Sequence, residues 1–167
     1  FDIEHSTKSI IKLTYVPVDY SVDCPASIAE GEPFNLKASG CSIETIVDRC
    51  GVVSAASING DEMTGSVNTG LLGEYSGYGR LGMLNFSRRT FFLKLKASNG
   101  VVFWHPVDIT VLPRVECAAV GEISNDGIKL LVRNNMSQAL NGPAVLRAAG
   151  AEFEFSVDVG PRSEKTY

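Results

Sequence analysis

The stretch from Thr90 to Leu112 constrains the fold of this chain more than any other feature of its sequence. Apolar side chains recur at every second position in residues 91–97 and again in residues 103–111, where His105 is the one exception. A period of two is typical of a β-strand with one face buried. The stretch therefore predicts two strands joined by a tight turn.

The register of this hairpin follows from the length of its loop. A two-residue loop would place Leu95 opposite Trp104 and would mix the two faces. A three-residue loop at 98–100 places Leu95 opposite Phe103, and the apolar residues then share one face. This loop type needs a left-handed residue in its last position, where the sequence has glycine. We therefore expect the three-residue loop.

This register assigns the neighbouring side chains to faces of the sheet. Trp104 and Phe92 are expected on the outer face, and His105 on the inner face. Pro106 has no backbone N–H to donate, so we expect the second strand to lie at a sheet edge at that point.

The rest of the 167-residue chain has the pattern of an all-β protein. Strand-period runs bounded by Gly, Asn, Asp and Pro recur, and helical spacing is nearly absent, which is typical of a β-sandwich. A net charge of −4 with no basic run argues against nucleic-acid binding. No apolar run approaches the roughly 20 residues that a membrane helix needs, so no membrane insertion is expected.

Three segments follow from these runs. Residues 1–13 are expected to be an N-terminal strand or linker, and residues 14–113 a complete immunoglobulin-like β-sandwich. Residues 114–167 contain about four strand signals where such a sandwich needs about seven, so they predict an incomplete second sandwich. We expect its missing strands to come from sequence beyond Tyr167, from Ile10–Leu13, or from a partner.

Two segments of the first domain carry the clearest side-chain pattern after the hairpin. Apolar residues in 34–38 are expected to alternate inward. In 43–47, Ile43, Thr45 and Val47 are expected on one face of a strand and Ile46 on the other.

Residues 114–167 also contain sequence motifs that are typical of a protein family. The residues that form it are Ile128, Leu130, Val132, Asn134, Asn135, Leu140 and Gly142, followed by Phe155, Val157, Val159, Gly160, Pro161 and Ser163. In these motifs the chain resembles bacterial immunoglobulin-like modules of secreted carbohydrate-active enzymes and surface proteins. The resemblance implies the sandwich fold and a secreted or cell-surface location, and it carries over no catalytic residues.

The four cysteines are candidates for disulfide bonds. Cys41 and Cys50 flank a predicted strand and are close enough in sequence to bridge a short loop. Cys24 and Cys117 would form the second pair, although four cysteines allow three pairings and buried free thiols are the alternative. An oxidising compartment is favoured.

No catalytic, metal or cofactor site is expected. His5 and His105 are the only histidines, and neither is placed beside a nucleophile and an orienting carboxylate. Zinc-binding CxxC pairs are absent. Asp61 and Glu62 lie in a polar loop, where they are weak candidates for calcium.

The aromatic residues are the best candidates for binding. Trp104, Phe92, Tyr75 and Tyr78 are expected to form an exposed platform for sugar rings or to pack at the junction between the two domains. We expect the packing role first, because a second domain begins after Pro113.

The sequence thus favours a non-catalytic extracellular spacer, accessory or binding module of a larger secreted protein. Its expected partners are neighbouring domains of the same polypeptide, another copy of itself, or a polysaccharide. The alternatives are a self-assembling surface or filament subunit that uses strand complementation, and a fragment of a secreted hydrolase.

Overall fold

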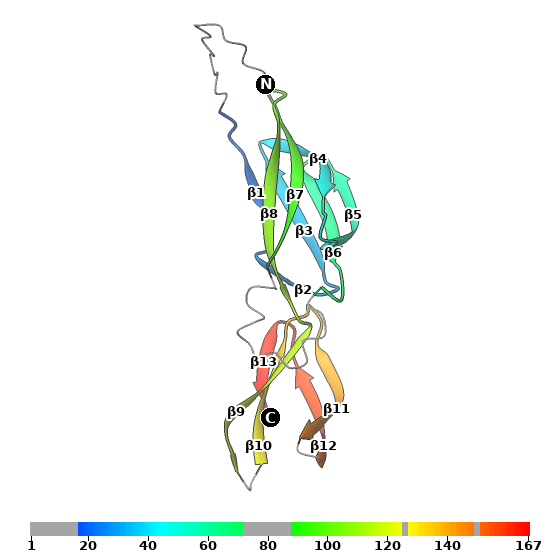
Figure 1. The fold of residues 1–167 in the computed structure, drawn as a ribbon, viewed down its shortest axis with the longest axis vertical. Helices are drawn as coiled ribbons and strands as arrows, with labels where there is room; N and C mark the ends of the chain where they lie inside the picture. Colours follow the sequence, from blue (N-terminus) through cyan, green and yellow to red (C-terminus); the bar gives the residue numbers. More distant parts are fainter. Residues whose placement is uncertain (1–16, 72–87, 125–126, 149–150) are drawn as a thin grey trace, which may run out of the picture.

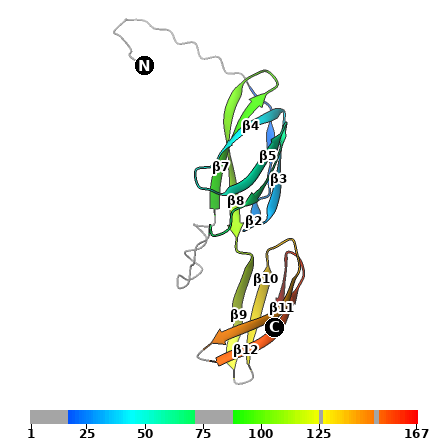
Figure 2. The same cartoon turned by 90° about the vertical axis from the view of Figure 1, so that its right-hand side faces the viewer.

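The computed structural model describes residues 17–71, 88–124, 127–148 and 151–167. All regular secondary structure in these ranges is β-strand, so the predicted all-β class is confirmed. Two groups of sheets lie end to end along the long axis (Figures 1 and 2). We call the sheets of residues 21–112 the first sheet pair and those of residues 115–167 the second sheet pair.

The first sheet pair consists of two four-stranded sheets, with strand orders β1-β3-β6-β5 and β2-β8-β7-β4. Its strands are β1 (Ser21–Asp23), β2 (Ser27–Ala29), β3 (Pro33–Ser39), β4 (Cys41–Val47), β5 (Val53–Asn59), β6 (Glu62–Val67), β7 (Arg88–Ala97) and β8 (Val102–Leu112).

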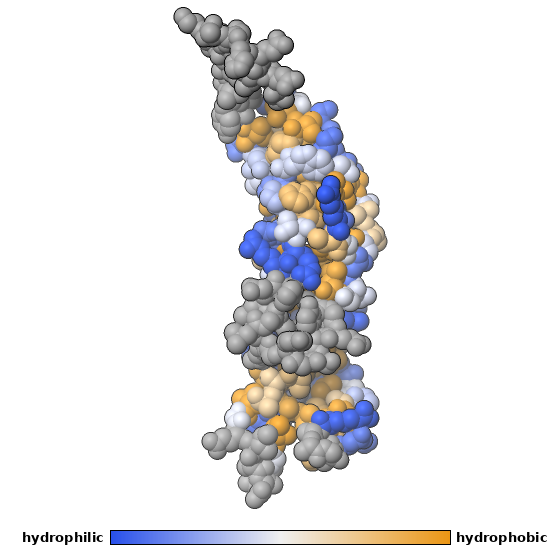
Figure 3. Space-filling view, in the orientation of Figure 1, coloured by the Kyte–Doolittle hydropathy of each residue, from blue (hydrophilic) through white to orange (hydrophobic). Residues whose placement is uncertain are grey.

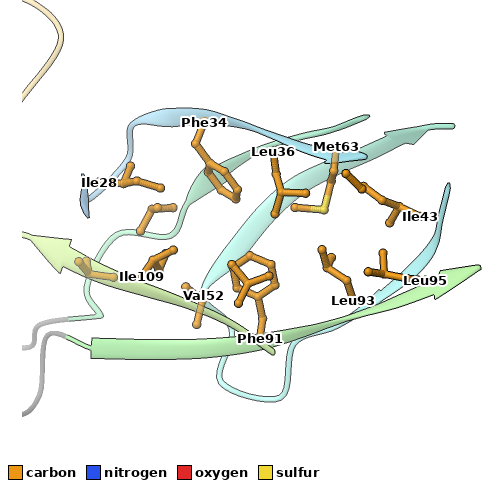
Figure 4. Close-up of a cluster of buried hydrophobic side chains, with 14 residues drawn as sticks. Ile28, Phe34, Leu36, Ile43, Val52, Met63, Phe91, Leu93, Leu95 and Ile109 are labelled. Carbon is orange, nitrogen blue, oxygen red and sulfur yellow. The ribbon is translucent and has the colours of Figure 1, made fainter. Parts of the chain in front are cut away.

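The core of the first sheet pair lies between the two sheets (Figure 4). The apolar residues of 34–38 point inward from β3, as predicted. Phe34 meets Phe91 of the facing sheet, with ring centroids 6.3 Å apart. Phe91, Leu93 and Leu95 of β7 are fully buried, and each contributes roughly 1.5–3 kcal/mol through burial.

The hairpin of β7 and β8 has the predicted register. Leu95 lies opposite Phe103, and Phe91 lies opposite Val107. Gly100 adopts a φ of 84°, so the last loop residue is left-handed, as the three-residue loop requires. Strand β2 pairs with β8 only at Thr110–Leu112. Among the described strands, β8 therefore has a free edge at the predicted position.

The expected faces of β4 were wrong, because a β-bulge interrupts this strand. Its pairing with β7 shifts register between Ile43 and Thr45. The extra residue brings both Ile43 and Ile46 onto the core. Val47 lies opposite Phe92, which turns outward.

The second sheet pair has a three-stranded sheet, β13-β10-β9, and a two-stranded sheet, β11-β12. Its strands are β9 (Val115–Ser124), β10 (Gly127–Asn134), β11 (Leu140–Ala148), β12 (Ala151–Val159) and β13 (Ser163–Thr166). The sequence pattern predicts the first four of these strands but not β13, which is short and lacks an apolar face.

Candidate binding groove and strand edge

Two exposed aromatic side chains lie on the outer face of the sheet β2-β8-β7-β4. The exposed fraction is 51% for Trp104 and 44% for Phe92. Trp104 lies opposite Lys94 and Phe92 lies opposite Pro106, so the two aromatic residues are diagonal neighbours on adjacent strands. Large side chains reach each other over that spacing.

A groove of about 690 Å³ opens beside these aromatic residues. Its lining residues come from the end of β4, the turn after it, and strands β7 and β8: Val47, Arg49, Cys50, Thr90, Phe92 and Trp104. The aromatic and aliphatic members lie on the sheet, whereas Arg49 and Cys50 lie on the turn. We call this site the Trp104 groove.

Backbone hydrogen bonds to Asp48 hold the turn that carries Arg49. The Asp48 carboxylate accepts the backbone N–H of Cys50 at 3.2 Å and that of Val53 at 2.7 Å. Gly51 has a φ of 63° in the same turn, a conformation that favours glycine. The arginine is therefore presented from an ordered turn.

Two pairs of charged groups on this face bind each other, whereas the exposed Lys96 of β7 forms no ion pair with a described residue. Lys94 forms an ion pair with Glu44 at 3.0 Å. Asp108 accepts hydrogen bonds from Thr90 and Arg88, and these hold the pKa of its carboxyl below the usual value. Within the described ranges the Arg49 guanidinium has no such partner, and it is the one charged side chain among the described residues that line the groove.

The groove contains two of the four aromatic residues that the sequence singled out. Trp104 and Phe92 are brought together, whereas Tyr75 and Tyr78 lie outside the described residues. The expected packing of Trp104 at the domain junction is not what the structure shows. Trp104 lies near the hairpin end of β8, and the second sheet pair follows the opposite end of that strand, after Leu112.

Both predicted disulfides are absent, because all four cysteines are free thiols in the structure. Strand β4 runs from Cys41 to Val47, about 20 Å at ~3.3 Å per residue, and Cys50 lies in the turn after its far end. A disulfide needs Cα atoms within about 7 Å. Cys24 and Cys117 belong to different sheet pairs.

His105 has a structural setting. It faces inward, as predicted, and its Nδ1 lies 3.2 Å from the hydroxyl of Tyr20 in a hydrogen bond. Burial lowers the pKa of this imidazole. His5 lies outside the described residues.

The acidic pair of the loop before β6 does not gather ligands for calcium. Glu62 forms an exposed ion pair with Lys37 at 2.9 Å. The described part of the chain holds no group of three or more His, Cys, Asp or Glu side chains arranged to bind a metal ion.

A smaller cavity of about 300 Å³ lies between the two sheet pairs. Its lining includes Glu32 of the first sheet pair and Arg133, Arg162 and Glu164 of the second. Arg133 forms ion pairs with Glu164 at 2.8 Å and with Glu116 at 3.1 Å. The sequence does not predict this cavity, because no local motif links residues so far apart in the chain.

The second sheet pair has an open strand edge on β11. On the neighbouring strand β12, the backbone N–H of Asp158 donates to the Tyr167 hydroxyl, and its carbonyl accepts from the Lys165 ammonium at 3.3 Å. The backbone groups of Asp158 thus point away from β11, and the Asn141–Asp158 pair is of the non-hydrogen-bonded type.

Because the β11–β12 ladder is regular, these pair types alternate along it. The backbone groups of Asn141, Pro143, Val145 and Arg147 therefore point away from β12. No described strand pairs with them there. Pro143 lies on this free edge, where its missing N–H breaks no bond of the ladder.

The inner face of β9 is uncovered on the same sheet pair. Val115 and Cys117 lie opposite Asn134 and Val132 of β10, so they share the face that holds the buried residues. Nevertheless Val115 is 39% exposed and Cys117 is also exposed. Hydrophobic residues reach the surface of this half (Figure 3). The second sheet pair thus has both an unpaired strand edge on β11 and an uncovered inner face on β9.

Comparison with known proteins gives no relative for this chain: no family model, curated protein or solved structure matches it. The described residues also include no helix that is long and apolar enough to cross a membrane.

Proposed function

We propose that the chain is a non-catalytic extracellular module that combines a spacer role with ligand binding at the Trp104 groove. We further propose that residues 14–113 form an immunoglobulin-like sandwich and that residues 114–167 form part of a second one. The observation that carries the binding role is the pair of exposed aromatic side chains, Trp104 and Phe92, beside a groove on a sheet with a fully buried core.

Physical chemistry favours a ligand here over an accidental exposure. Large aromatic side chains lose favourable burial when they face water, and an exposed apolar group beside a concave surface is typical of a binding site. The sheet underneath holds the backbone of both aromatic residues in place. We propose a polysaccharide as the ligand, because the flat faces of sugar rings stack on such side chains.

The secreted or cell-surface location rests on the resemblance to bacterial immunoglobulin-like modules. Neighbouring domains of the same polypeptide remain proposed partners. No feature of the groove specifically favours the other alternative, a fragment of a secreted hydrolase.

Fluorescence tests the binding role directly, because Trp104 is the single tryptophan of the chain. Titration with soluble oligosaccharides should change its emission in a saturable way. Phe92→Ala should weaken that response, and Phe153→Ala, an exposed phenylalanine on the second sheet pair, should leave it unchanged. A chain whose emission responds to no oligosaccharide would contradict the binding role.

A second candidate function is supported by the open edge of β11. We propose, as the alternative, that the chain is a surface or filament subunit whose second sheet pair accepts a strand from another copy. Unpaired edge groups are a template for strand addition, and an uncovered apolar face gains from being covered. The segment Ile10–Leu13 is the proposed donor, because it combines strand-forming residues with apolar side chains.

Solution mass and hydrogen exchange separate the two candidates. A subunit that assembles should grow in mass with concentration, and its Val145 and Arg147 amides should then become protected. Deletion of residues 1–13 should abolish both effects. A spacer should stay monomeric, with rapid exchange at Val145 and Arg147 and slower exchange at Ala144 and Leu146, which face β12.

A further inference from the structure

The charge of the Trp104 groove points to a more specific ligand than a sugar ring alone. We propose that the groove binds a linear acidic glycan, with sugar rings against Trp104 and Phe92 and a uronic-acid carboxylate on Arg49. This inference rests on the proposed sugar-binding function and adds the ligand class. It follows from the apolar floor, the position of the arginine in the lining and the pairing of the neighbouring charges Lys94 and Asp108.

The floor of the groove fits the less polar face of a sugar ring. Trp104, Phe92 and Val47 present aromatic and aliphatic surface, and Pro106 lies beside Phe92 on the same outer face. A pyranose ring turns its C–H groups to one side, which pack on such a surface while the hydroxyl groups stay in water. This floor alone does not distinguish neutral from acidic sugars.

Arg49 provides that distinction. Lys94 is neutralised by Glu44, and Asp108 is engaged by Arg88 and Thr90. The Arg49 guanidinium has no comparable partner within the described ranges, although the chain as a whole has a net charge of −4. A guanidinium binds a carboxylate through two parallel hydrogen bonds, which favours a planar acid over a hydroxyl group.

The spacing along the strands favours an oligosaccharide over a single sugar. Val47 lies opposite Phe92, so Arg49 leaves β4 close to the level of Thr90. Trp104 lies opposite Lys94, four residues from Thr90 along β7. Four residues of strand span about 13 Å. Two or three linked rings cover that length, with one ring near Trp104 and the carboxylate of another near Arg49.

A matched pair of ligands tests the charge. The full chain is titrated with oligogalacturonate and oligomannuronate, and with the methyl ester of each, while the Trp104 emission is followed. Each ester keeps the rings and removes the charge. We expect the acids to bind about tenfold more tightly than their esters at low salt, since a hydrogen bond to a charged group is worth that factor or more.

Substitutions test the roles proposed for Arg49 and Trp104 in binding. Arg49→Gln should reduce the affinity for the acids to that of the esters and leave the ester affinity unchanged. Arg147→Gln removes the same charge from the distant strand β11 and should change neither. Trp104→Ala should weaken the binding of acids and esters alike. Its binding is measured by calorimetry, because this variant has no tryptophan emission to follow.

The outcomes separate this inference from the function on which it rests. Equal binding of acids and esters, or Arg49→Gln binding like the unmodified chain, would overturn the acidic ligand and leave sugar binding intact. The absence of any response to all four ligands would overturn both. That result would point instead to a protein partner, since exposed Trp and Arg side chains are also enriched at protein interfaces.

Discussion

The Glu32 carboxylate accepts a hydrogen bond from the backbone N–H of Ser137 at 3.0 Å and so joins the first sheet pair to the loop after β10. The same loop is held to the linker between the pairs. The side-chain amide of Asn135 donates to the Pro113 carbonyl at 2.8 Å, and its backbone N–H donates to the Arg114 carbonyl at 3.0 Å. The end-to-end arrangement is thus fixed by a few polar contacts.

Glu32→Ala should loosen this junction with little loss of stability. The lost bond is exposed, so the expected cost is below about 1.5 kcal/mol. Small-angle scattering should show a broader distribution of end-to-end distances. Glu62→Ala is the control, because it removes an exposed ion pair within the first sheet pair. Identical scattering for both variants would show that Glu32 does not orient the halves.

The two adjacent phenylalanines of β7 should respond very differently to truncation. Phe91 is fully buried, so Phe91→Ala should cost about 3–5 kcal/mol. Phe92 is 44% exposed on the outer face, and Phe92→Ala should cost less than about 1.5 kcal/mol. Urea unfolding of the two variants measures the difference. Equal losses would mean that the register of the hairpin is wrong.

The hairpin could be predicted from sequence because two independent constraints agree there. The hydrophobic period fixes which residues share a face, and the position of Gly100 fixes the loop length. Strand β4 has no such second constraint. Its bulge inserts one residue without any Gly or Pro to mark it, so parity alone assigned Ile46 to the wrong face.

The candidate groove could be predicted only in part, for a related reason. The outward positions of Trp104 and Phe92 follow from strand parity. Arg49 reaches the groove because the turn held by Asp48 folds back beside β7, and this contact depends on tertiary structure. The free cysteines show the same limit. Cys41 and Cys50 are close in sequence, but the extended strand β4 lies between them, and both remain free thiols.

The four thiols should differ in reactivity with an alkylating reagent. Burial, with a smaller effect of Asp23, raises the pKa of the Cys24 thiol to about 11, so little of it is thiolate at neutral pH. Cys50 and Cys117 are exposed. Mass spectrometry after brief treatment with iodoacetamide should find Cys50 and Cys117 modified well before Cys24.

The result would also test the disulfide prediction. All four cysteines should react once the chain is unfolded without reductant, because the structure contains only free thiols. A pair that stays unmodified under those conditions would be disulfide-bonded, contrary to the structure.

Stability should fall as the pH drops below about 6.5, because His105 titrates differently in the folded and unfolded chain. Burial lowers the pKa of its imidazole in the folded state, whereas the unfolded chain keeps the ordinary value near 6.5. Between these two values the unfolded state binds more protons, so the free energy of unfolding rises with pH. The contribution is complete above about pH 6.5 and is lost as the pH falls toward the folded pKa.

Urea unfolding between pH 5 and pH 7.5 should show this slope, and His105→Gln should reduce it. His5→Gln is the matched control, and a slope that persists in His105→Gln but disappears in His5→Gln would assign the effect to the other histidine.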